Sequence, residues 1–479
     1  MIDTIVAPAT IPGTGAISLV RLSGPDCFRI ADAVVQLKSG TISEAKPYTI
    51  HFGQIVIPGE AEGSLQSRLL DEVLVSVFRA PHSYTGEDSV EISAHASAYI
   101  VQEIVRLLQD AGARMAEPGE FTRRAFLNGK MDLAQAEAVA DLISSSTEAS
   151  HRVAMNQLKG SYSKELATLR EELLQMASLL ELELDFSEEE VEFASRERLK
   201  ALVNATYTHV AALADSFRQG NLIKNGVPVA IIGPPNAGKS TLLNALLAEE
   251  RAIVSDFPGT TRDSIEERVN WDGYLFRFID TAGLRESDDM VEKMGIARTM
   301  ELARKAEVLL LVLDATEAED KLLETTRQVL SELVTSGHKV HILLNKSDKI
   351  DQNSTNIFVS NINKYVKLID IKCDIIPISA KCGNGLEALK KALVDAQKNV
   401  VSNTQATFVT NERHYSALKE ASQALLDVRQ TLSTSLPTDL IAEDLRRAIA
   451  SINSILGTDL GLDAQTVLNR IFQSHCIGK

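Results

Sequence analysis

The sequence predicts a multidomain protein that combines an α+β domain, an all-α bundle and an α/β nucleotide-binding domain. Three observations support this prediction. The first part of the chain alternates strand-like runs with glycine and proline turns, two later regions carry apolar residues three and four positions apart, and a glycine-rich phosphate loop lies between those regions. Because amphipathic helices on both sides of an insertion need a partner, we expect the P-loop domain to be inserted into one discontinuous helical bundle. The expected domains are 1–120 (α+β), 121–225 (helical, first part), 226–402 (nucleotide-binding) and 403–479 (helical, second part).

Composition restricts the class of protein further. The chain has 479 residues, a hydrophobic share of 44% and a formal net charge of −16. This length suits several domains, and the negative charge argues against a broad nucleic-acid surface while leaving a local basic patch open. The four cysteines are scattered and form no CxxC pair, which argues against a disulfide framework or a zinc site. We see no signal-peptide pattern and no apolar run of membrane-spanning length, so we expect a soluble cytoplasmic protein.

The N-terminal region is expected to form an α+β domain without a phosphate loop of its own. Strand-like runs occupy residues 16–22, 48–52, 72–78 and 89–93, and an amphipathic helix follows around residues 100–108. Arg21 and Glu91 lie within two of these runs. From the residues alone, a solvated strand face is their simplest interpretation.

Helical periodicity appears before and after the nucleotide-binding region. Residues 121–142 and 162–186 are predicted helices, and apolar residues form one stripe along the second. The acidic run at 188–190 is interpreted as a solvated helix start or loop rather than a metal site. Beyond the nucleotide-binding region, one helix begins near residue 411 and another spans 440–456.

The chain is organised around Gly-Pro-Pro-Asn-Ala-Gly-Lys-Ser at residues 233–240, which fits the phosphate-loop pattern GxxxxGK[ST]. Residues 229–232 read as a buried strand before it and residues 241–247 as the start of a helix, which is the context that the pattern requires. Backbone N–H groups and the helix N-terminus would hold a polyphosphate, Lys239 would reach its β- and γ-phosphates, and the Ser240 hydroxyl would ligate Mg²⁺. The alternative is a plain glycine turn between a strand and a helix.

Four more motifs follow in the order and spacing of the loops of a Ras-like GTPase, each after a strand-like run. They are Gly-Thr-Thr-Arg-Asp at 259–263, Asp-Thr-Ala-Gly at 280–283, Asn-Lys-Ser-Asp at 345–348 and Ser-Ala-Lys at 379–381. Thr261 would give Mg²⁺ a second hydroxyl while its segment closes over the γ-phosphate. Asp280 would hold a magnesium-bound water, and the Gly283 N–H would approach the γ-phosphate. Each motif alone is weak evidence, whereas the ordered set predicts a GTPase domain.

The third and fourth motifs predict which base is bound. The Asp348 carboxylate would accept from the two N–H groups at the edge of guanine, which adenine lacks, and Asn345 and the Ala380 backbone would complete the pocket. One position departs from the Ras-like pattern, because Leu284 stands where a glutamine would orient the attacking water. Hydrolysis therefore needs another group, and Glu286 lies just beyond.

Six further segments lie outside the GTPase motifs. They are Asp-Thr-Ile-Val-Ala at 3–7, Arg-Leu-Ser-Gly at 21–24, Tyr-Thr-Gly-Glu-Asp at 84–88, Pro-Gly-Glu-Phe-Thr at 118–122, Asp-Leu-Ala-Gln-Ala-Glu-Ala at 132–138 and Cys-Ile-Gly-Lys at 476–479. With these segments the chain resembles the MnmE (TrmE) family of tRNA-modification GTPases over essentially its whole length. The last two segments are far more specific than the GTPase loops, which many families share.

The resemblance implies an enzyme that works with MnmG, a protein that uses FAD and NADH. Together they would add a carboxymethylaminomethyl or aminomethyl group to C5 of the wobble uridine of certain tRNAs. A tetrahydrofolate derivative of the 5-formyl type, bound to the N-terminal domain, would supply the one-carbon unit. The resemblance also implies a homodimer through that domain, a heterotetramer with MnmG, and GTPase domains that dimerise on activation with the help of K⁺.

Site residues follow from the same resemblance. The implied folate contacts are Arg21, Glu91, Lys130 and Lys479. An arginine and lysines suit the polar groups of the pterin and the glutamate tail, and a carboxylate suits the pterin amine edge. Ser18 replaces a common glycine and Ala96-Ser97 replaces a glycine pair, so the backbone near this site is less permissive. Cys476 acts near the transferred carbon or is a spectator thiol.

The implied K⁺ ligands are the Asn236 side chain and the carbonyl oxygens of Ser255, Phe257 and Thr260. Glu286 takes the position of the family's water-orienting glutamate and, with Lys239, is the predicted catalytic residue. Motifs and resemblance together predict GTP contacts from Asn236, Ala237, Gly238, Lys239, Ser240, Thr241, Ser255, Asp256, Phe257, Pro258, Gly259, Thr260, Thr261, Asp280, Thr281, Ala282, Gly283, Asn345, Lys346, Asp348, Ser379, Ala380 and Lys381.

Two alternatives stay open at this stage. Arg446 and Arg447 could contact tRNA, although a solvated helix face is the simpler interpretation. The chain could also be a ribosome-assembly switch in which GTP only regulates binding to RNA. That hypothesis leaves the N-terminal domain and the Cys-Ile-Gly-Lys terminus without an explanation.

Overall fold

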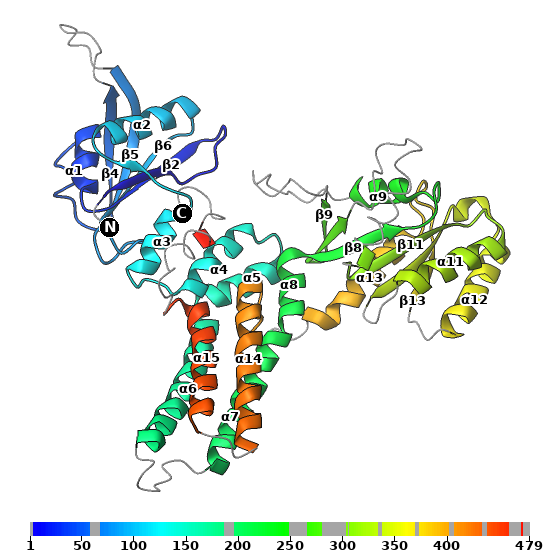
Figure 1. Ribbon diagram of the computed structural model, residues 1–479. Coiled ribbons are helices and arrows are strands. Elements are labelled where there is room, and N and C mark those ends of the chain that lie inside the picture. The colour runs from blue at the N-terminus through cyan, green and yellow to red at the C-terminus, as the bar shows by residue number, and fades with distance from the viewer. Residues whose placement is uncertain are drawn as a thin grey trace, which may run out of the picture. The chain divides into compact units, whose positions relative to one another are not determined.

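The computed structural model describes residues 3–57, 68–185, 196–248, 266–279, 303–304, 306–333, 338–368, 373–401, 407–433, 438–458 and 471–472. The chain divides into two compact units, one of Met1–Ala140, Asn156–Val203 and Gln423–Lys479 and the other of Asp141–Met155 and Asn204–Ser422. The predicted combination of α+β, helical and α/β parts is confirmed (Figure 1). Within the described residues, no helix is long and apolar enough to cross a membrane.

The first unit begins with a seven-stranded sheet in the order β3-β4-β5-β6-β2-β1-β7. The described neighbouring strands pair antiparallel except β1 and β7, which run parallel. The strands are β1 (Ile5–Pro8), β2 (Ile17–Ser23), β3 (Val35–Leu37), β4 (Thr49–Ile57), β5 (Arg68–Phe78), β6 (Ser89–His95) and β7 (Arg114–Met115). All four predicted strand runs are found, in β2, β4, β5 and β6.

One face of this sheet is covered by two helices, and the opposite face, here called the open face, is covered in part by Phe121 and Tyr84. Val20 of β2 and Ile92 of β6 belong to an apolar core that includes residues of α1 (Cys27–Val34) and α2 (Ala98–Asp110). Side chains alternate along a strand, so Arg21 and Glu91 lie on the opposite face. Figure 1 shows α1 and α2 against the sheet.

The predicted single helix over 121–142 is wrong. The structure has two helices there, α3 (Glu120–Leu127) and α4 (Leu133–Ser144). The chain turns between them at Gly129, whose φ of +68° is a conformation that a residue with a Cβ rarely adopts. The turn is important because it places Lys130, which follows α3, in contact with the loop between β5 and β6.

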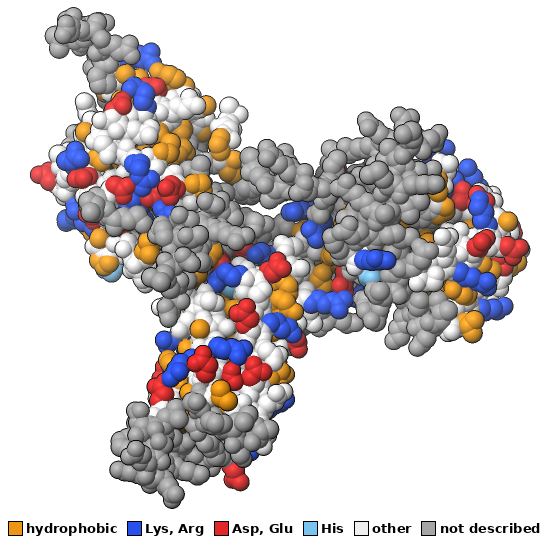
Figure 2. Space-filling model, viewed as in Figure 1, with side chains coloured by type: hydrophobic (Ala, Val, Ile, Leu, Met, Phe, Trp, Pro, Cys, Tyr) orange, Lys and Arg blue, Asp and Glu red, His pale blue; other side chains and the backbone are white. Residues whose placement is uncertain are grey.

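Two long helices of the first unit pack on one another although they are far apart in the sequence. They are α6 (Ser161–Asp185) and α15 (Thr438–Leu456), close to their predicted bounds. Arg170 Nε of α6 donates to Asn453 Oδ1 of α15 at 2.6 Å. Arg446 pairs with Glu181 at 2.7 Å, and Figure 2 shows basic and acidic side chains interspersed on this surface. Residues 188–190 lie outside the described part of the chain.

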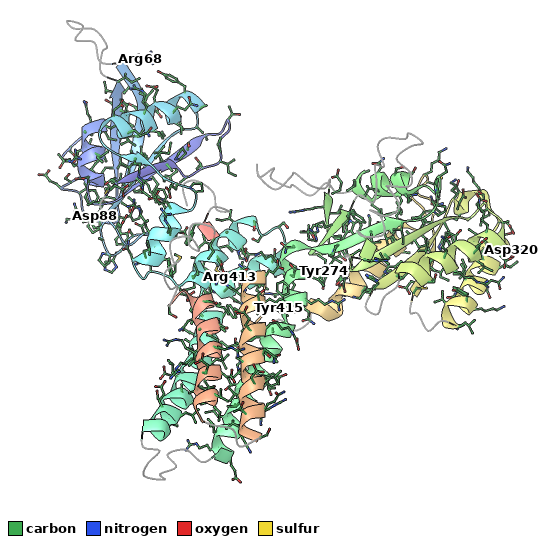
Figure 3. The ribbon with its side chains drawn as sticks, in the orientation of Figure 1. Arg68, Asp88, Tyr274, Asp320, Arg413 and Tyr415 are labelled. Carbon is green, nitrogen blue, oxygen red and sulfur yellow. The ribbon has the colours of Figure 1, made fainter. Side chains whose placement is uncertain are left out.

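Further helices precede and follow the nucleotide-binding region in the sequence: α5 (Glu148–Leu158), α7 (Arg196–Asp215), α8 (Phe217–Asn225) and α14 (Glu412–Ser433). In the second unit, α8 and α14 begin side by side. The rings of Phe217 and Tyr415 stack with centroids 4.6 Å apart and an interplanar angle of 16°. Figure 3 labels Tyr415. Just before these two helices, the Val409 N–H donates to Ser216 Oγ at 3.1 Å.

The second unit contains a six-stranded sheet in the order β13-β12-β11-β8-β10-β9. Its strands run parallel except for β9, which pairs antiparallel with β10. The strands are β8 (Val227–Ile232), β9 (Glu266–Trp271), β10 (Tyr274–Ile279), β11 (Val308–Asp314), β12 (Lys339–Asn345) and β13 (Cys373–Pro377). Their near-continuous apolar sequences follow from burial on both faces.

Helices cover both faces of this sheet. Apolar residues of α9 (Lys239–Ala248) and α13 (Leu386–Val401) join one core with Val229 and Leu310. Residues of α11 (Glu319–Leu333) and α12 (Gln352–Leu368) join a second core with Ala230 and Leu311. In such a sheet the loops after the carboxyl ends of the parallel strands meet at one edge, where ligands bind. The loops that carry the phosphate-loop, Asn-Lys-Ser-Asp and Ser-Ala-Lys motifs therefore lie together.

Candidate functional site

The phosphate loop follows β8 directly, and its glycines are required by sterics. Gly233 has φ +144°, and a Cβ there would lie 2.2 Å from the carbonyl oxygen of Val312. Gly238 has φ +95°, and a Cβ there would lie 2.2 Å from Asn345 Nδ2. Both distances are far below van der Waals contact, so only glycine fits at either position. The loop ends where α9 begins at Lys239, as the phosphate-binding interpretation requires.

The Lys239 amine folds back over the loop. Its Nζ donates to the carbonyl oxygens of Gly233 and Pro234, each at 2.9 Å. Burial lowers the pKa of this amine below its ordinary value because desolvation disfavours the charged form. An anion beside the amine would offset that cost. The Ser240 side chain stands next to it in the first turn of α9 and is half-buried, while Thr241 is exposed.

Asn345, the last residue of β12, connects two of the predicted loops. Its Nδ2 donates to the carbonyl oxygen of Ala237 at 2.7 Å, and its Oδ1 accepts from the Ala380 N–H at 3.0 Å. The residue is 3% exposed. In this structure its carboxamide holds the phosphate loop and the Ser-Ala-Lys loop together, which is a role that sequence reasoning did not assign to it.

Lys346 adds a second connection to the phosphate loop. The residue has φ +62°, and its Nζ donates to the carbonyl oxygen of Asn236 at 3.0 Å. The same nitrogen lies 2.5 Å from Asp314 Oδ2. Burial alone would raise the pKa of the Asp314 carboxyl, but hydrogen bonds from Lys346 and Thr316 lower it overall. Sequence reasoning missed Asp314, although its place at the carboxyl end of β11 was a usable signal.

Asp348 presents an exposed, ionised carboxylate at the same edge of the sheet, within a short 3-10 helix (Ser347–Lys349). A hydrogen bond from Ser379 is the main cause that lowers the pKa of this carboxyl, and the charges of Lys349 and Lys381 act in the same direction. An ionised carboxylate is an acceptor only, which suits the two N–H groups at the edge of guanine. The structure thus brings together the described residues of three predicted motifs.

The remaining predicted nucleotide residues lie outside the described part of the chain. They are Ser255, Asp256, Phe257, Pro258, Gly259, Thr260, Thr261, Asp280, Thr281, Ala282, Gly283 and Glu286. The same holds for Lys479 and Cys476 of the C-terminal motif. Their predicted roles stay predictions.

A second polar site lies on the open face of the N-terminal sheet. Arg21 and Glu91 are directly opposite each other on β2 and β6, and Arg21 Nη2 lies 2.7 Å from Glu91 Oε1. The Arg21 guanidinium faces two aromatic rings, with centroids at 5.4 Å for Tyr84 and 5.7 Å for Phe121. These rings are part of the site and were not predicted as contacts. The Arg21 guanidinium is therefore bordered by a carboxylate and by two aromatic rings.

Lys130 contacts the loop between β5 and β6, which also carries Tyr84. Its Nζ donates to the carbonyl oxygen of Pro81 at 3.0 Å. A Cβ added at Gly86 would lie 3.3 Å from the Lys130 side chain, so the loop backbone passes close to it. Of the predicted folate residues, Arg21 and Glu91 are therefore paired, and Lys130 borders the loop whose Tyr84 covers Arg21.

The chain matches two protein-family models and curated proteins over its whole length. The family model for the MnmE helical domain matches residues 133–476, and the model for the N-terminus of the GTP-binding protein TrmE matches residues 4–130. A protein of Bacteroides fragilis named tRNA modification GTPase MnmE is 48% identical over 480 residues, covering 100% of this chain and 99% of the relative. Proteins of the same name from Flavobacterium johnsoniae and Cytophaga hutchinsonii are each 47% identical to this chain. Both matches cover 100% of this chain, with 99% of the Flavobacterium johnsoniae protein and 98% of the Cytophaga hutchinsonii protein. The chain belongs to the MnmE (TrmE) family of tRNA modification GTPases.

Proposed function

We propose that this protein hydrolyses GTP to drive the modification of wobble uridine in tRNA. The observation that carries the GTP assignment is the pair of bonds from Asn345 to Ala237 and Ala380. Through them the phosphate loop and the loop beside Asp348 are held as parts of one pocket. A single nucleotide with a guanine base and a polyphosphate matches both ends of that pocket.

The phosphate end would take the β- and γ-phosphates. Loop N–H groups and the N-terminus of α9 favour an anion there, and the Lys239 amine would exchange the carbonyl oxygens of Gly233 and Pro234 for phosphate oxygens. We propose that Mg²⁺ is held by the hydroxyl of Ser240, the residue after Lys239 on α9. Thr261 and Asp280 are the other residues proposed to hold the ion. When bound, the ion would neutralise charge on the phosphate oxygens.

In the proposed reaction, water attacks the γ-phosphorus, the bond to the β-γ bridging oxygen breaks, and GDP and phosphate leave. Leu284 has no polar group to orient that water, so we assign the task to Glu286. We propose K⁺ as the cation that offsets charge developing between the phosphates, with Asn236, Ser255, Phe257 and Thr260 as its ligands. Asn236 is exposed on the phosphate loop, and its φ of +61° turns the loop at that residue.

The open face of the N-terminal sheet fits a tetrahydrofolate derivative by the chemistry of its groups. Glu91 suits the amine edge of a pterin, Arg21 and the rings of Tyr84 and Phe121 suit a stacked ring system, and Lys130 suits a carboxylate tail. We propose Lys479 as a further contact. When bound, the folate would supply the one-carbon unit of the modification.

We further propose a homodimer and a complex with MnmG. Support for the homodimer comes from large apolar residues exposed on the open face of the N-terminal sheet. Ile50 is 67% exposed, Phe52 is 45% exposed, and Leu74, which lies directly opposite Phe52, is 48% exposed. An apolar patch of this kind is typical of a surface that another protein covers. The tRNA substrate and MnmG would place the protein in the cytoplasm.

Turnover of GTP and ATP by the purified protein tests the nucleotide assignment. We expect GTP to be hydrolysed and ATP, at the same concentration and with the same Mg²⁺, to be left intact, because adenine cannot give Asp348 two N–H groups. Equal turnover of both nucleotides would remove the guanine assignment. A change in the wobble uridines of tRNA on loss of the gene tests the proposed role in modification.

A further inference from the structure

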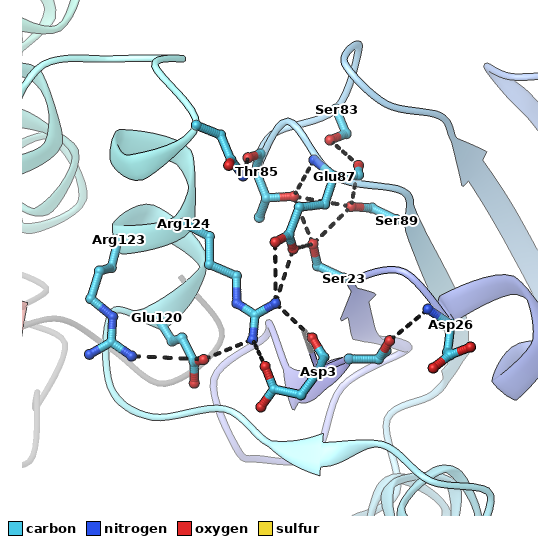
Figure 4. Close-up of polar contacts among 12 residues, drawn as sticks. Asp3, Ser23, Asp26, Ser83, Thr85, Glu87, Ser89, Glu120, Arg123 and Arg124 are labelled. Carbon is cyan, nitrogen blue, oxygen red and sulfur yellow. Dashed lines mark hydrogen bonds and ion pairs between the residues drawn. The ribbon is translucent and has the colours of Figure 1, made fainter. Parts of the chain in front are cut away.

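We propose that Arg124 is a positioning residue for the Arg21 site. Acting through Glu87, it fixes the loop of residues 79–88 (Figure 4). The Tyr84 ring of this loop lies against the Arg21 guanidinium. The inference rests on the proposed folate site, because it concerns the wall of that site. Arg124 acts on that site through the loop.

Arg124 is the buried centre of a group of charged side chains. Its side chain is 1% exposed and lies on α3. Nη1 donates to the Asp3 carbonyl oxygen at 2.9 Å and to both Glu87 carboxylate oxygens at 3.2 and 3.3 Å. Nη2 donates to Asp3 Oδ1 at 2.8 Å and to Glu120 Oε1 at 3.0 Å. One guanidinium therefore joins the start of β1, the loop and α3.

Glu87 also bonds to β2, the strand that carries Arg21. Its Oε2 accepts from Ser23 Oγ at 2.8 Å, and Ser23 lies two residues after Arg21 on β2. Ser23 Oγ also lies 2.7 Å from Thr85 Oγ1, and the Glu87 N–H donates to the same Thr85 oxygen at 3.2 Å. Since alternate residues of a strand share a face, Ser23 and Arg21 are on the same side of the sheet as the loop.

The loop is also bonded to α3 and to the turn after it. Tyr84 Oη lies 2.8 Å from Thr122 Oγ1, and Asn128 Nδ2 donates to the Thr85 carbonyl oxygen at 2.8 Å. With the bond from Lys130 to Pro81, both described cationic residues of the proposed folate site contact this one loop. Any change in the loop would move the Tyr84 ring and the Lys130 amine together.

An arginine is required at this position by geometry. Its planar fork can bind Glu87, Glu120 and Asp3 at the same time, whereas a lysine amine is a single point of charge and cannot reach all three. Arg124→Lys would therefore keep the charge and release the loop. The neighbouring Arg114 is the natural control, because it binds Asp3 at 2.7 Å and Glu120 at 2.6 Å from the solvent side.

The experiment titrates the full-length protein with 5-formyl-tetrahydrofolate. We expect R124K to bind about tenfold more weakly than the wild type, the usual scale for losing a charged hydrogen bond, and R114K to stay within about twofold. Thermal unfolding of each variant checks that the protein is folded. Wild-type affinity for the folate in R124K would overturn the inference. Equal losses of affinity in R124K and R114K would also overturn it, because they would indicate a general loosening of the charged group.

A double-mutant cycle tests the route through Glu87. If Arg124 acts through that carboxylate, E87Q and R124K should each weaken binding and the double variant should be no worse than R124K alone. Additive losses would contradict the route. Hydrogen exchange of residues 79–88, compared with α2 in the same domain, gives a readout that needs no ligand. We expect faster exchange of the loop in R124K and E87Q and wild-type exchange in R114K. If the wild type binds no folate, the folate proposal fails, and the exchange data still decide whether Arg124 positions the loop.

Discussion

The Nδ2 atom of Asn345 lies 2.7 Å from the carbonyl oxygen of Ala237, and this bond joins the end of β12 to the phosphate loop. The other end of the same carboxamide accepts from the Ala380 N–H. A buried side chain thus holds the phosphate loop and the Ser-Ala-Lys loop, the two ends of the proposed nucleotide pocket, at a fixed distance. Preorganisation of this kind lowers the entropic cost of binding a rigid ligand.

Asn345→Ala should weaken GTP binding by about tenfold or more, because it leaves the Ala237 carbonyl and the Ala380 N–H without their partner. The same loss should lower the free energy of unfolding by about 1–3 kcal/mol. A GTP titration and urea unfolding measure the two effects. Asn225→Ala, which removes an exposed bond to Asn221 at the end of α8, is the control. Unchanged GTP affinity in N345A would show that the bond does not organise the pocket.

Gly238→Ala should abolish GTP binding and destabilise the protein by about 2–3 kcal/mol, because the new Cβ meets Asn345 and the residue is strained at its φ. Gly273→Ala is a matched control. Gly273 has a similar φ of +83° and open space around it, so only the backbone strain of about 1 kcal/mol is expected there. Similar effects in both variants would mean that φ alone matters and that the contact with Asn345 does not.

The meeting of the phosphate-loop, Asn-Lys-Ser-Asp and Ser-Ala-Lys motifs at one edge of the sheet was predictable from the sequence, because each motif lies at the end of a strand-like run. Parallel strands bring their carboxyl ends to one edge. The role of each residue in nucleotide binding stays a prediction. The bond from Lys346 to Asp314 was not predictable, because it depends on β11 lying between β8 and β12 in the sheet. Strand order is a long-range property that local patterns do not contain.

The N-terminal site was predicted less completely. The resemblance supplied Arg21, Glu91 and Lys130, and strand periodicity alone indicated only a solvated face. Tyr84 and Phe121 come from a loop and from the start of α3, so their approach to Arg21 depends on the fold. The helix boundary at Gly129 was missed because the apolar pattern continues across it, whereas the turn is set by a single positive φ.

Acid should weaken the first unit through Glu120. Burial alone would raise the pKa of this carboxyl, but hydrogen bonds from Arg114, the Glu117 N–H and Arg124 lower it overall. A carboxyl with a lowered pKa in the folded state stabilises the protein above its ordinary pKa of about 4, and this contribution is lost as the pH falls through the folded value. When thermal unfolding is measured from pH 7 downward, the unfolding temperature should therefore fall more steeply below about pH 4 for the wild type than for E120Q. Parallel curves of unfolding temperature against pH for the two proteins would contradict this prediction. E44Q, which changes an exposed glutamate, is the control.

GTP turnover should be faster in K⁺ than in Na⁺ at equal ionic strength, because a fitting cation offsets charge that develops on the phosphates. Asn236→Ala should remove the difference between the two salts and leave the slow basal rate. Single-turnover kinetics in each salt measure this. Equal rates for the wild type in K⁺ and Na⁺ would remove the potassium proposal and leave GTP binding intact.

Mass spectrometry of tRNA nucleosides tests most directly whether GTP bound through Asp348 drives tRNA modification. Cells whose only copy of the gene carries D348N should lack the modified wobble uridine that wild-type cells contain, because the variant cannot pair with both N–H groups of guanine. The purified D348N protein should instead accept xanthosine triphosphate, whose base offers an oxygen to the new amide. A normal content of modified uridine in D348N cells would contradict the account.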